Sequence, residues 1–323
     1  MKKIKLVLSI ILIGLFFAGI GCVEKTTKIN EVRVGYQPTT HHIAEFIGIQ
    51  KGWFSQETGV NFTDKEFIGG ASEMEAMMAG ELDMAYVGAV PAINAIEKGL
   101  KAKIVASANN EGSALVMRND FNYTKPDDLI GKKIATLQPP SIQDTVFRVW
   151  LLDSGIKPED VDIKYMSGAE MLTSLSSGAI DGFIWAEPGP TQAVMKGVGK
   201  IVLNSSDMWM HPCCVVVVSD DLIEKNPDLV QKIVNTHVKA MNYIGTNENE
   251  TINISANKLK LSPEVLKKSL DSGRTKYNPD PRLIEGGIQR FADDLVSIKV
   301  LTRQVNTSDL FDFTFYDNAK KNP

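Results

Sequence analysis

Two stretches of the sequence decide the fold: GELDMAYVGAVPA at residues 80–92, and GAIDGFIWAEPGP at residues 178–190, which repeats it at an offset of 98 residues (from 80 to 178). Each stretch carries a single aspartate, Asp83 or Asp181, followed by a short apolar segment. The two segments are largely hydrophobic on both faces, which is typical of strands covered on both sides. A unit that recurs in this way indicates two halves built on one plan.

A helix is expected before each of these strands. Apolar residues three apart, such as Met74 and Met77 in the first copy, give a one-faced helix that ends at a glycine. An earlier strand is expected before each helix, at NFTDKEFIG (61–69) and VDIKYMS (161–167). Strand, helix and strand, twice over, predict two α/β lobes with parallel sheets.

The ends of the two repeated strands are candidates for a ligand site, because an open α/β sheet binds ligands beyond the carboxyl ends of its strands. If the lobes face each other, the turn at Gly88 and Ala89 meets the turn at Trp185 across one cleft. We expect Gly88 to let a small molecule approach the backbone, although a simple tight turn would also use glycine there. Trp185 is a flat group suited to a ligand wall.

The N-terminal residues are predicted to be an export signal. Three lysines precede an apolar run at residues 6–20, which is short for a membrane span. We expect a signal peptide at 1–21, lipidation of Cys22 and a linker at 22–29, although Gly19 departs from the usual bacterial pattern. An uncleaved anchor is the alternative, and either reading tethers the protein to the outer face of a membrane.

Composition and cysteine content exclude several classes of protein. The 323-residue chain has a net charge of −4, and removal of the three signal lysines makes it −7, so we expect no nucleic-acid partner. Cys213 and Cys214 are adjacent and poorly placed for a disulfide. Although His211 is near, the spacing typical of metal sites is absent, and we interpret both as small hydrophobic residues of a buried strand. We expect no metal and no cofactor.

Six stretches together resemble the solute-binding proteins of ABC importers for nitrate, sulfonates, taurine and thiamine-pyrimidine precursors. The resemblance implies the type II periplasmic-binding-protein fold: two Rossmann-like α/β lobes, joined by two crossing strands, with a ligand cleft between them. It places the crossings at ALVMRND (114–120) and CCVVVVSDD (213–221). We expect lobe one at 30–116 and 217–323, and lobe two at 117–216. The stretches are VRVGYQPTTHH (32–42), KGWFSQETGVN (51–61), GGASEMEAMMAGELDMAYVGAVPA (69–92), DDLIGKKIA (127–135), SSGAIDGFIWAEPGP (176–190) and DLFDFTFYDNAKK (309–321).

Three helices are expected to begin at the cleft, at residues 39–42, 69–72 and 139–142, where free backbone N–H groups suit an anion or a carbonyl oxygen. We interpret Ser72 as a helix cap and Ser141 as a ligand contact. No arginine or lysine occurs in these turns, which favours a monoanion or a neutral polar solute. The expected ligand contacts are Gln37, His41, Gly70, Ala71, Gly88, Ala89, Ser113, Ser141, Trp185 and Glu187.

Two of these assignments have alternatives. Either His41 or His42 is expected to point into the cleft, but the pair could also be a solvated helix start. Glu187 could accept a hydrogen bond from an amino group of the solute, or it could be a structural acid in the Trp-x-Glu-Pro turn.

The resemblance implies transport: a monomeric, non-enzymatic protein that captures a solute outside the cell and delivers it to a membrane permease with its ATPase subunit. Two alternatives remain. Related families on this fold include a pyrimidine synthase and enzymes of menaquinone synthesis, although we find no nucleophile, base and acid arranged for catalysis. A sensory binding protein that reports to a receptor is the second alternative.

Overall fold

The computed structural model describes residues 29–321. The signal peptide predicted at 1–21 and the lipidation predicted at Cys22 lie outside the described residues, as does nearly all of the predicted linker. Among the described helices, none has both the length and the apolarity that a bilayer crossing requires.

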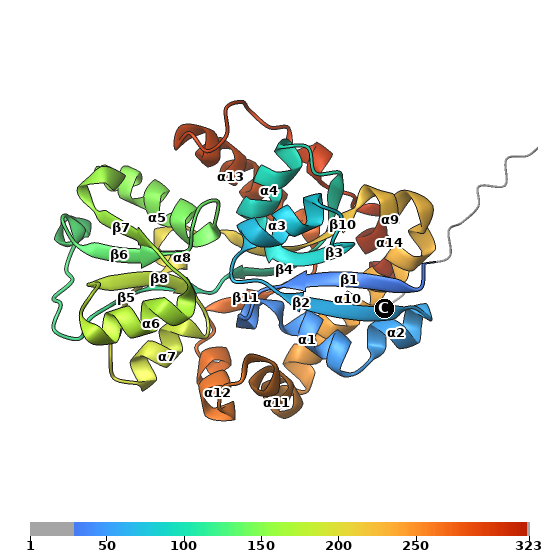
Figure 1. The fold of residues 1–323 in the computed structure, drawn as a ribbon, viewed down its shortest axis with the longest axis horizontal. Helices are drawn as coiled ribbons and strands as arrows, with labels where there is room; N and C mark the ends of the chain where they lie inside the picture. Colours follow the sequence, from blue (N-terminus) through green and yellow to red (C-terminus); the bar gives the residue numbers. More distant parts are fainter. Residues whose placement is uncertain (1–28, 322–323) are drawn as a thin grey trace, which may run out of the picture.

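Two β-sheets form the centres of two lobes (Figure 1). Their strand orders correspond: β11-β4-β10-β3-β1-β2 in lobe one and β9-β5-β8-β6-β7 in lobe two, with β11 as the extra edge strand. The central strands β1 and β6 pair in parallel with both neighbours, and β10 and β5 run antiparallel to theirs. The strands are β1 Glu31–Tyr36, β2 Asn61–Glu66, β3 Met84–Gly88, β4 Ala102–Glu111, β5 Ser113–Met117, β6 Lys133–Thr136, β7 Asp162–Tyr165, β8 Gly182–Ala186, β9 Lys200–Asn204, β10 Pro212–Ser219 and β11 Thr275–Tyr277.

The repeat read from the sequence is confirmed element by element. Helix α3 (Gly70–Met78) leads into β3, and helix α6 (Gly168–Ser177) leads into β8. The first residue of α6 lies 98 positions after that of α3. The first and last residues of β8 lie 98 positions after those of β3.

The lone aspartate of each copy fixes the register of its strand. Asp83 accepts a hydrogen bond from the backbone N–H of Arg33 (2.8 Å), and Asp181 accepts one from the backbone N–H of Lys133 (2.9 Å). The backbone N–H groups of Asp83 and Asp181 donate to the carbonyls of the same two residues, each at 2.9 Å. Each aspartate therefore clamps the start of its strand to the neighbouring parallel strand, β1 or β6.

Helices cover both faces of each sheet, as the apolar character of the strands predicts. The lobe-one core includes fully buried Tyr86 and Phe291, and lobe two has a cluster on each face of its sheet, around Phe147 and around Phe183. The helices of lobe one are α1 Ile43–Gln50, α2 Trp53–Thr58, α3, α4 Ala89–Glu97, α9 Asp220–Lys225, α10 Pro227–Thr246, α11 Glu248–Leu259, α12 Pro263–Asp271, α13 Glu285–Ser297 and α14 Thr314–Lys321; those of lobe two are α5 Ile142–Asp153, α6, α7 Gly189–Met195 and α8 Ser205–Met208. Short 3₁₀ helices are η1 Thr40–His42, η2 Pro126–Leu129, η3 Pro158–Asp160, η4 Pro281–Ile284 and η5 Thr307–Leu310.

The chain changes lobes at places that differ from those expected. The predicted crossing strands are β5 and β10, but each of them pairs within one sheet only. The chain instead passes from lobe one to lobe two at Gly112, between β4 and β5, and returns through residues 209–211, between α8 and β10. The boundaries expected at 116/117 and 216/217 therefore fall inside paired strands. A continuous apolar run in the sequence does not show where the chain passes from one sheet to the other.

A buried ion pair braces the two lobes. Glu187, which follows β8 of lobe two, is fully buried and accepts hydrogen bonds from Arg274 (2.6 Å) and Ser269 (2.9 Å) of lobe one. Arg274 also donates to Thr191 in α7 (3.0 Å), and Figure 1 shows α12 beside α7. The arginine thus holds the end of β8 against the C-terminal part of lobe one.

Replacing Arg274 with methionine should destabilise the protein strongly. The change leaves the Glu187 carboxylate buried without a cation, and breaking a buried pair in this way costs about 3–5 kcal/mol. Equilibrium denaturation of the full chain in urea, held in mild detergent, measures the loss.

Lys268→Met is the matched control. Lys268 pairs with Glu264 on the exposed face of α12, where a surface ion pair contributes less than about 1 kcal/mol. Equal losses for the two variants would show that the buried pair does not brace the lobes.

Candidate functional site

A cleft runs between the lobes and contains three adjoining cavities of about 390, 20 and 290 Å³. Leu137, which follows β6, contributes to the walls of all three, so the cavities adjoin one another at this residue. The largest lies between the start of α3 and the loops before α5 and α6. The smallest is beside His41, and the third extends past Trp185 to the end of α11.

The start of α3 presents unpaired backbone donors to the largest cavity. Its N-cap residue is Gly69, which has no side chain to accept a hydrogen bond. The first N–H groups of a helix have no partner within the helix, so those of Gly70, Ala71 and Ser72 are free for a ligand. The positive end of the helix dipole adds to this preference for an anion.

The serines at the helix starts have roles that differ in part from those expected. Ser72, interpreted as a cap, lies inside α3 and donates to the carbonyl of Gly69 (2.9 Å). Ser141, interpreted as a ligand contact, is the N-cap of α5, where its hydroxyl accepts from the N–H of Asp144 (3.3 Å), and it also lines two of the cavities. A serine can cap a helix and face a ligand, so the sequence alone does not separate the two roles.

Trp185 forms a wall shared by the two smaller cavities. A Cβ atom placed on Gly168 would lie 1.9 Å from the indole ring, and one on Gly189 would lie 2.0 Å from it. Only glycine at both positions leaves room for the ring. The start of α6 and the start of α7 therefore hold the indole in one orientation.

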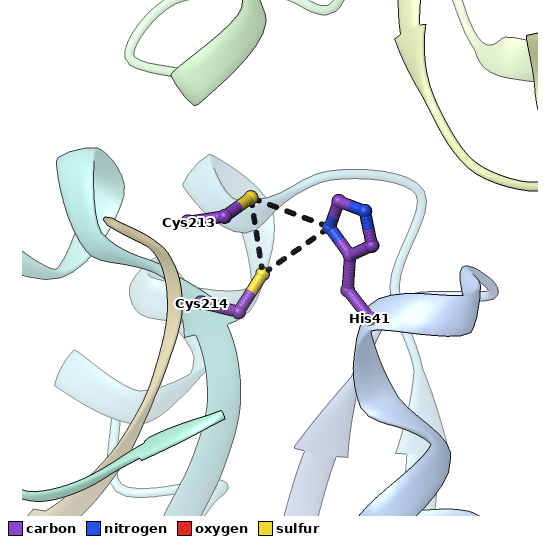
Figure 2. A group of neighbouring side chains, drawn as sticks. All are labelled: His41, Cys213 and Cys214. Carbon is purple, nitrogen blue, oxygen red and sulfur yellow. Dashed lines mark hydrogen bonds between the residues drawn. The ribbon is translucent and has the colours of Figure 1, made fainter. Parts of the chain in front are cut away.

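His41 meets two cysteines at the smallest cavity (Figure 2). Its Nδ1 atom lies 3.3 Å from the Sγ atom of Cys213 and 3.7 Å from that of Cys214, and the two sulfurs are 3.7 Å apart. All three residues are buried. The interpretation of both cysteines as plain hydrophobic residues is therefore wrong, because folding brings them to a histidine 172 and 173 positions away in the sequence.

Proton sharing within this cluster favours a thiolate. Burial raises the pKa of the Cys213 thiol, but a hydrogen bond from Cys214 and the charge of His41 outweigh it, and the pKa falls well below its usual range. Burial lowers the pKa of His41, but Cys213 more than compensates and raises it. Burial and the neighbouring Cys213 raise the pKa of Cys214. The cluster can therefore act as a metal ligand set or as an activated sulfur.

His42 points away from the cavities. Its Nδ1 atom accepts from the backbone N–H of Gln37 (2.9 Å), and its pKa is lowered to about 3, mainly by burial and also by His41. Gln37 lines the two smaller cavities, and its side-chain amide donates to the buried carboxyl of Glu73 (2.8 Å). Of the two adjacent histidines, His41 alone contributes to these cavities.

Three of the residues expected to contact ligand do not line the cleft. Ala89 is buried in α4, and Ser113 accepts from the amide of Gln143 (2.9 Å). Glu187 is the structural acid already described, because Arg274 and Ser269 occupy its carboxylate. The remaining expected residues do line the cavities: Gln37, His41, Gly70, Ala71, Gly88, Ser141 and Trp185.

Gly88 lines the smallest cavity, as expected, and a second constraint also requires a small residue there. A Cβ atom at this position would lie 3.1 Å from Ile142 of lobe two and 3.3 Å from Pro91. The glycine therefore lets the two lobes approach each other, in addition to lining the smallest cavity.

The sequence analysis missed Cys213, Cys214 and Gln143 as cavity residues. The signal for the cysteines is topological: β10 runs antiparallel to β3, so its first residues lie at the carboxyl end of β3, opposite Gly88. A strand that enters a sheet antiparallel presents its beginning to the ligand edge.

Apart from the cluster of His41 and the two cysteines, the charged residues that line the cavities are acidic. Within the described residues, the three linings contain no lysine or arginine and include Glu66, Glu75 and Glu170. Glu170 already accepts from the N–H and hydroxyl of Ser167 at the start of α6 (2.7 Å each), which leaves α3 with the better exposed donors.

A buried carboxyl lies beneath lobe one's side of the cleft. Glu45, in the first turn of α1, has neither oxygen in a hydrogen bond. Burial raises its pKa to about 8; Lys258 opposes this shift and Glu73 adds to it. Below this pH the folded protein holds a proton that the unfolded chain releases near its ordinary pKa of 4.5.

Gly168→Ala should force Trp185 out of its position, because the added methyl group overlaps the ring. Overpacking of this kind costs about 1–3 kcal/mol, and we expect the near-ultraviolet circular dichroism of the tryptophans to change as well. Gly286→Ala, in α13 with open space around it, should change neither signal. Similar spectra for wild type and Gly168→Ala would contradict the placement of the indole.

Glu45→Gln should stabilise the protein increasingly as the pH rises. Because the folded-state pKa is raised, the stability that Glu45 contributes falls between pH 4.5 and about 8, whereas glutamine does not titrate. Thermal unfolding of the two proteins from pH 5 to pH 9 measures the difference, with exposed Glu159→Gln as the control. A difference that stays constant across this range would contradict a buried neutral carboxyl.

Known proteins resemble the chain in sequence and in fold. The taurine-binding periplasmic protein of Escherichia coli (strain K12) is 28% identical over 193 residues, a match that covers 58% of this chain and 58% of that protein. The alkanesulfonate-binding protein of Xanthomonas axonopodis pv. citri, solved with bound MOPS, superposes with a TM-score of 0.80 at 19% identity, over 89% of this chain and 99% of that one.

The periplasmic nitrate-binding protein of Synechocystis PCC 6803 superposes with a TM-score of 0.79 at 17% identity, over 91% of this chain and 89% of that one. The two-lobed periplasmic-binding-protein fold expected from the sequence is thus confirmed. The model of the NMT1-like family matches residues 25–259, most of the chain. The chain belongs to the NMT1-like family.

Proposed function

We propose that this protein is the extracytoplasmic solute-binding component of an ABC import system, lipid-anchored at Cys22 on the outer face of the membrane. It captures a small monoanionic or neutral polar solute between its lobes and delivers it to a permease with its ATPase subunit. The protein acts as a monomer and performs no covalent chemistry on the solute.

The observation that carries this proposal is the charge pattern of the cleft. The free N–H groups at the start of α3 offer a site for one negative group, without the lysine or arginine that a dianion would require. Glu75 lines the same cavity, and Glu66 lines the third. A solute that places a sulfonate at the start of α3 and an ammonium group near one of these carboxylates matches both the donors and the acidic residues of the cleft.

The relatives support the same class of solute. The names of the similar proteins include taurine, alkanesulfonate and nitrate. Each is small and carries a single anionic group. Trp185 adds an apolar wall that suits the carbon chain of a sulfonate or a planar ring.

An enzyme is the second candidate, because His41 and Cys213 form a close pair in the cleft. A cysteine nucleophile needs a base and an approach path for a substrate carbon. The cavity beside this pair is only about 20 Å³, too small for most organic substrates. We therefore favour capture of an unmodified solute.

The first experiment is thermal unfolding of the full chain in mild detergent, freed of carried-over ligand, against taurine, ethanesulfonate, nitrate, bicarbonate and an aminopyrimidine. A ligand at 100 times its Kd stabilises the folded state by ~2.7 kcal/mol, enough to raise the Tm by a few degrees. We expect a sulfonate to give the largest shift, and Trp185→Ala to abolish it.

Trp53→Ala is the matched control. Trp53 lies on α2, where it contacts Tyr243, and it lines none of the three cavities. This variant should keep the full ligand shift even if its Tm without ligand is lower. No shift with any compound, or an equal shift in Trp185→Ala, would overturn the proposed solute class.

A further inference from the structure

We propose that His41, Cys213 and Cys214 bind a thiophilic d¹⁰ metal ion, Zn²⁺ in preference to Cu⁺, at the floor of the cleft. The inference concerns the metal ion alone and does not depend on which solute the protein carries. It rests on the positions of three ligand atoms, on the orientation of the histidine, on the charge balance of the buried cluster and on the space beside it.

The three ligand atoms already lie at the spacing of a metal coordination sphere. Bonds of about 2.3 Å to sulfur and about 2.0–2.1 Å to nitrogen, at tetrahedral angles, place two sulfur ligands about 3.8 Å apart and a sulfur and a nitrogen about 3.6 Å apart. The two sulfurs are 3.7 Å apart, and Nδ1 of His41 is 3.3 and 3.7 Å from them. Figure 2 shows the two sulfurs and this ring nitrogen facing one another.

The backbone holds the imidazole in the orientation that metal binding requires. Nε2 of His41 donates to the carbonyl oxygen of Gly112 at 3.1 Å, which leaves Nδ1 as the nitrogen that faces the sulfurs. Metal-binding histidines usually donate their second N–H in this way, which fixes the tautomer. A Cβ atom on Gly112 would lie 2.3 Å from Nε2, and the residue has a φ of +88°, so glycine is required for this contact.

Charge balance favours zinc. Two thiolates and a neutral imidazole carry two negative charges, which Zn²⁺ neutralises and Cu⁺ does not. All three side chains are buried, and a buried net charge is costly. Sulfur and imidazole ligands suit both ions, whereas Mg²⁺ and Ca²⁺ prefer oxygen ligands.

One coordination position stays open toward the cleft. Within residues 29–321, no fourth histidine, cysteine or carboxylate joins this cluster. The adjoining cavity of about 20 Å³ has room for about one water molecule or one donor atom of a solute. Its opposite wall comes from lobe two, through Ser141 and Gln143. Three protein ligands and one exchangeable position are typical of zinc sites that bind small molecules.

The test is metal binding by the reduced full chain with Cys22→Ala, which removes the third thiol. The protein is stripped of metal without oxygen and titrated with Zn²⁺ against a chromophoric chelator, and bound zinc is counted by mass spectrometry. We expect one Zn²⁺ per chain. Co²⁺ in its place should give the thiolate charge-transfer absorption of a tetrahedral site.

Cys213→Ser and Cys214→Ser should each weaken zinc binding by about 100-fold or more and abolish the charge-transfer band. His237→Gln alters another fully buried histidine, bonded to Tyr86 and Ser107 away from the cluster, and should keep one zinc. Circular dichroism of the metal-free variants shows that they are folded. A competition between Zn²⁺ and Cu⁺ tests the choice of ion: we expect zinc to stay bound, and its displacement by one equivalent of Cu⁺ would overturn the preference for zinc.

Less than one tenth of an equivalent of Zn²⁺ in the Cys22→Ala protein, or zinc binding that is as tight in both serine variants as in that protein, would overturn the proposal. The outcome is separable from solute capture, because the ligand shifts are measured with and without zinc. A protein that binds sulfonates but no metal would refute only the metal site.

Discussion

The carbonyl oxygen of Gly112 is the point on which both lobes and the cleft depend. It accepts hydrogen bonds from the backbone N–H of Glu187 (2.8 Å) and from Nε2 of His41 (3.1 Å). The carbonyl of Glu187 in turn accepts from the N–H of Thr40 (3.0 Å). One short run of backbone therefore holds three features together: the first crossing of the chain, the end of β8 and the histidine at the cleft floor. Because His41 leaves no room for a side chain, this residue has to be glycine.

Around that point the protein separates two kinds of polar group. The buried pair of Glu187 and Arg274 holds the lobes together on the side of α12, and both partners use their charge on each other. The groups free to contact a solute are backbone donors at α3, neutral side chains and carboxylates at the rim. Because the three linings contain no lysine or arginine, we propose that the cleft recognises an anionic solute through helix termini, which cannot move or titrate. Under the proposed function, selectivity comes from the shape set by Trp185 and its two glycines.

The parts of the structure that follow from local pattern were predictable from the sequence. The repeated helix and strand, their offset and the two-lobed fold are confirmed, because each depends on apolar periodicity and glycine within a dozen residues. Where β10 and β5 sit in their sheets was not predictable, since strand partners are chosen across the whole chain. Glu187 shows the same limit. The sequence identifies it as an acidic residue of a turn, but its structural role depends on Arg274, 87 residues away.

The residues of the candidate site fall into the same two groups: those predictable from local sequence pattern, and those that depend on how distant strands pair. Helix starts and the wall at Trp185 could be located from turn residues and the position of strand ends. The meeting of His41 with Cys213 and Cys214 could not, because it needs the direction of β10 as well as its existence. An apolar run such as CCVVVV reads the same in both directions, and only the sheet shows which end reaches the cleft.

The strand order also sets a sequence of events during synthesis. All five strands of lobe two, from β5 to β9, come from one continuous segment that ends at Asn204. Lobe one needs β10 between β3 and β4, and β10 ends at Ser219. As the chain emerges from its N-terminus, the second lobe can complete its sheet first, while β3 and β4 of the first lobe wait for a partner. The strands of lobe one that are synthesised first can therefore complete their sheet only after those of lobe two, and β3 and β4 have unpaired edges until β10 is made.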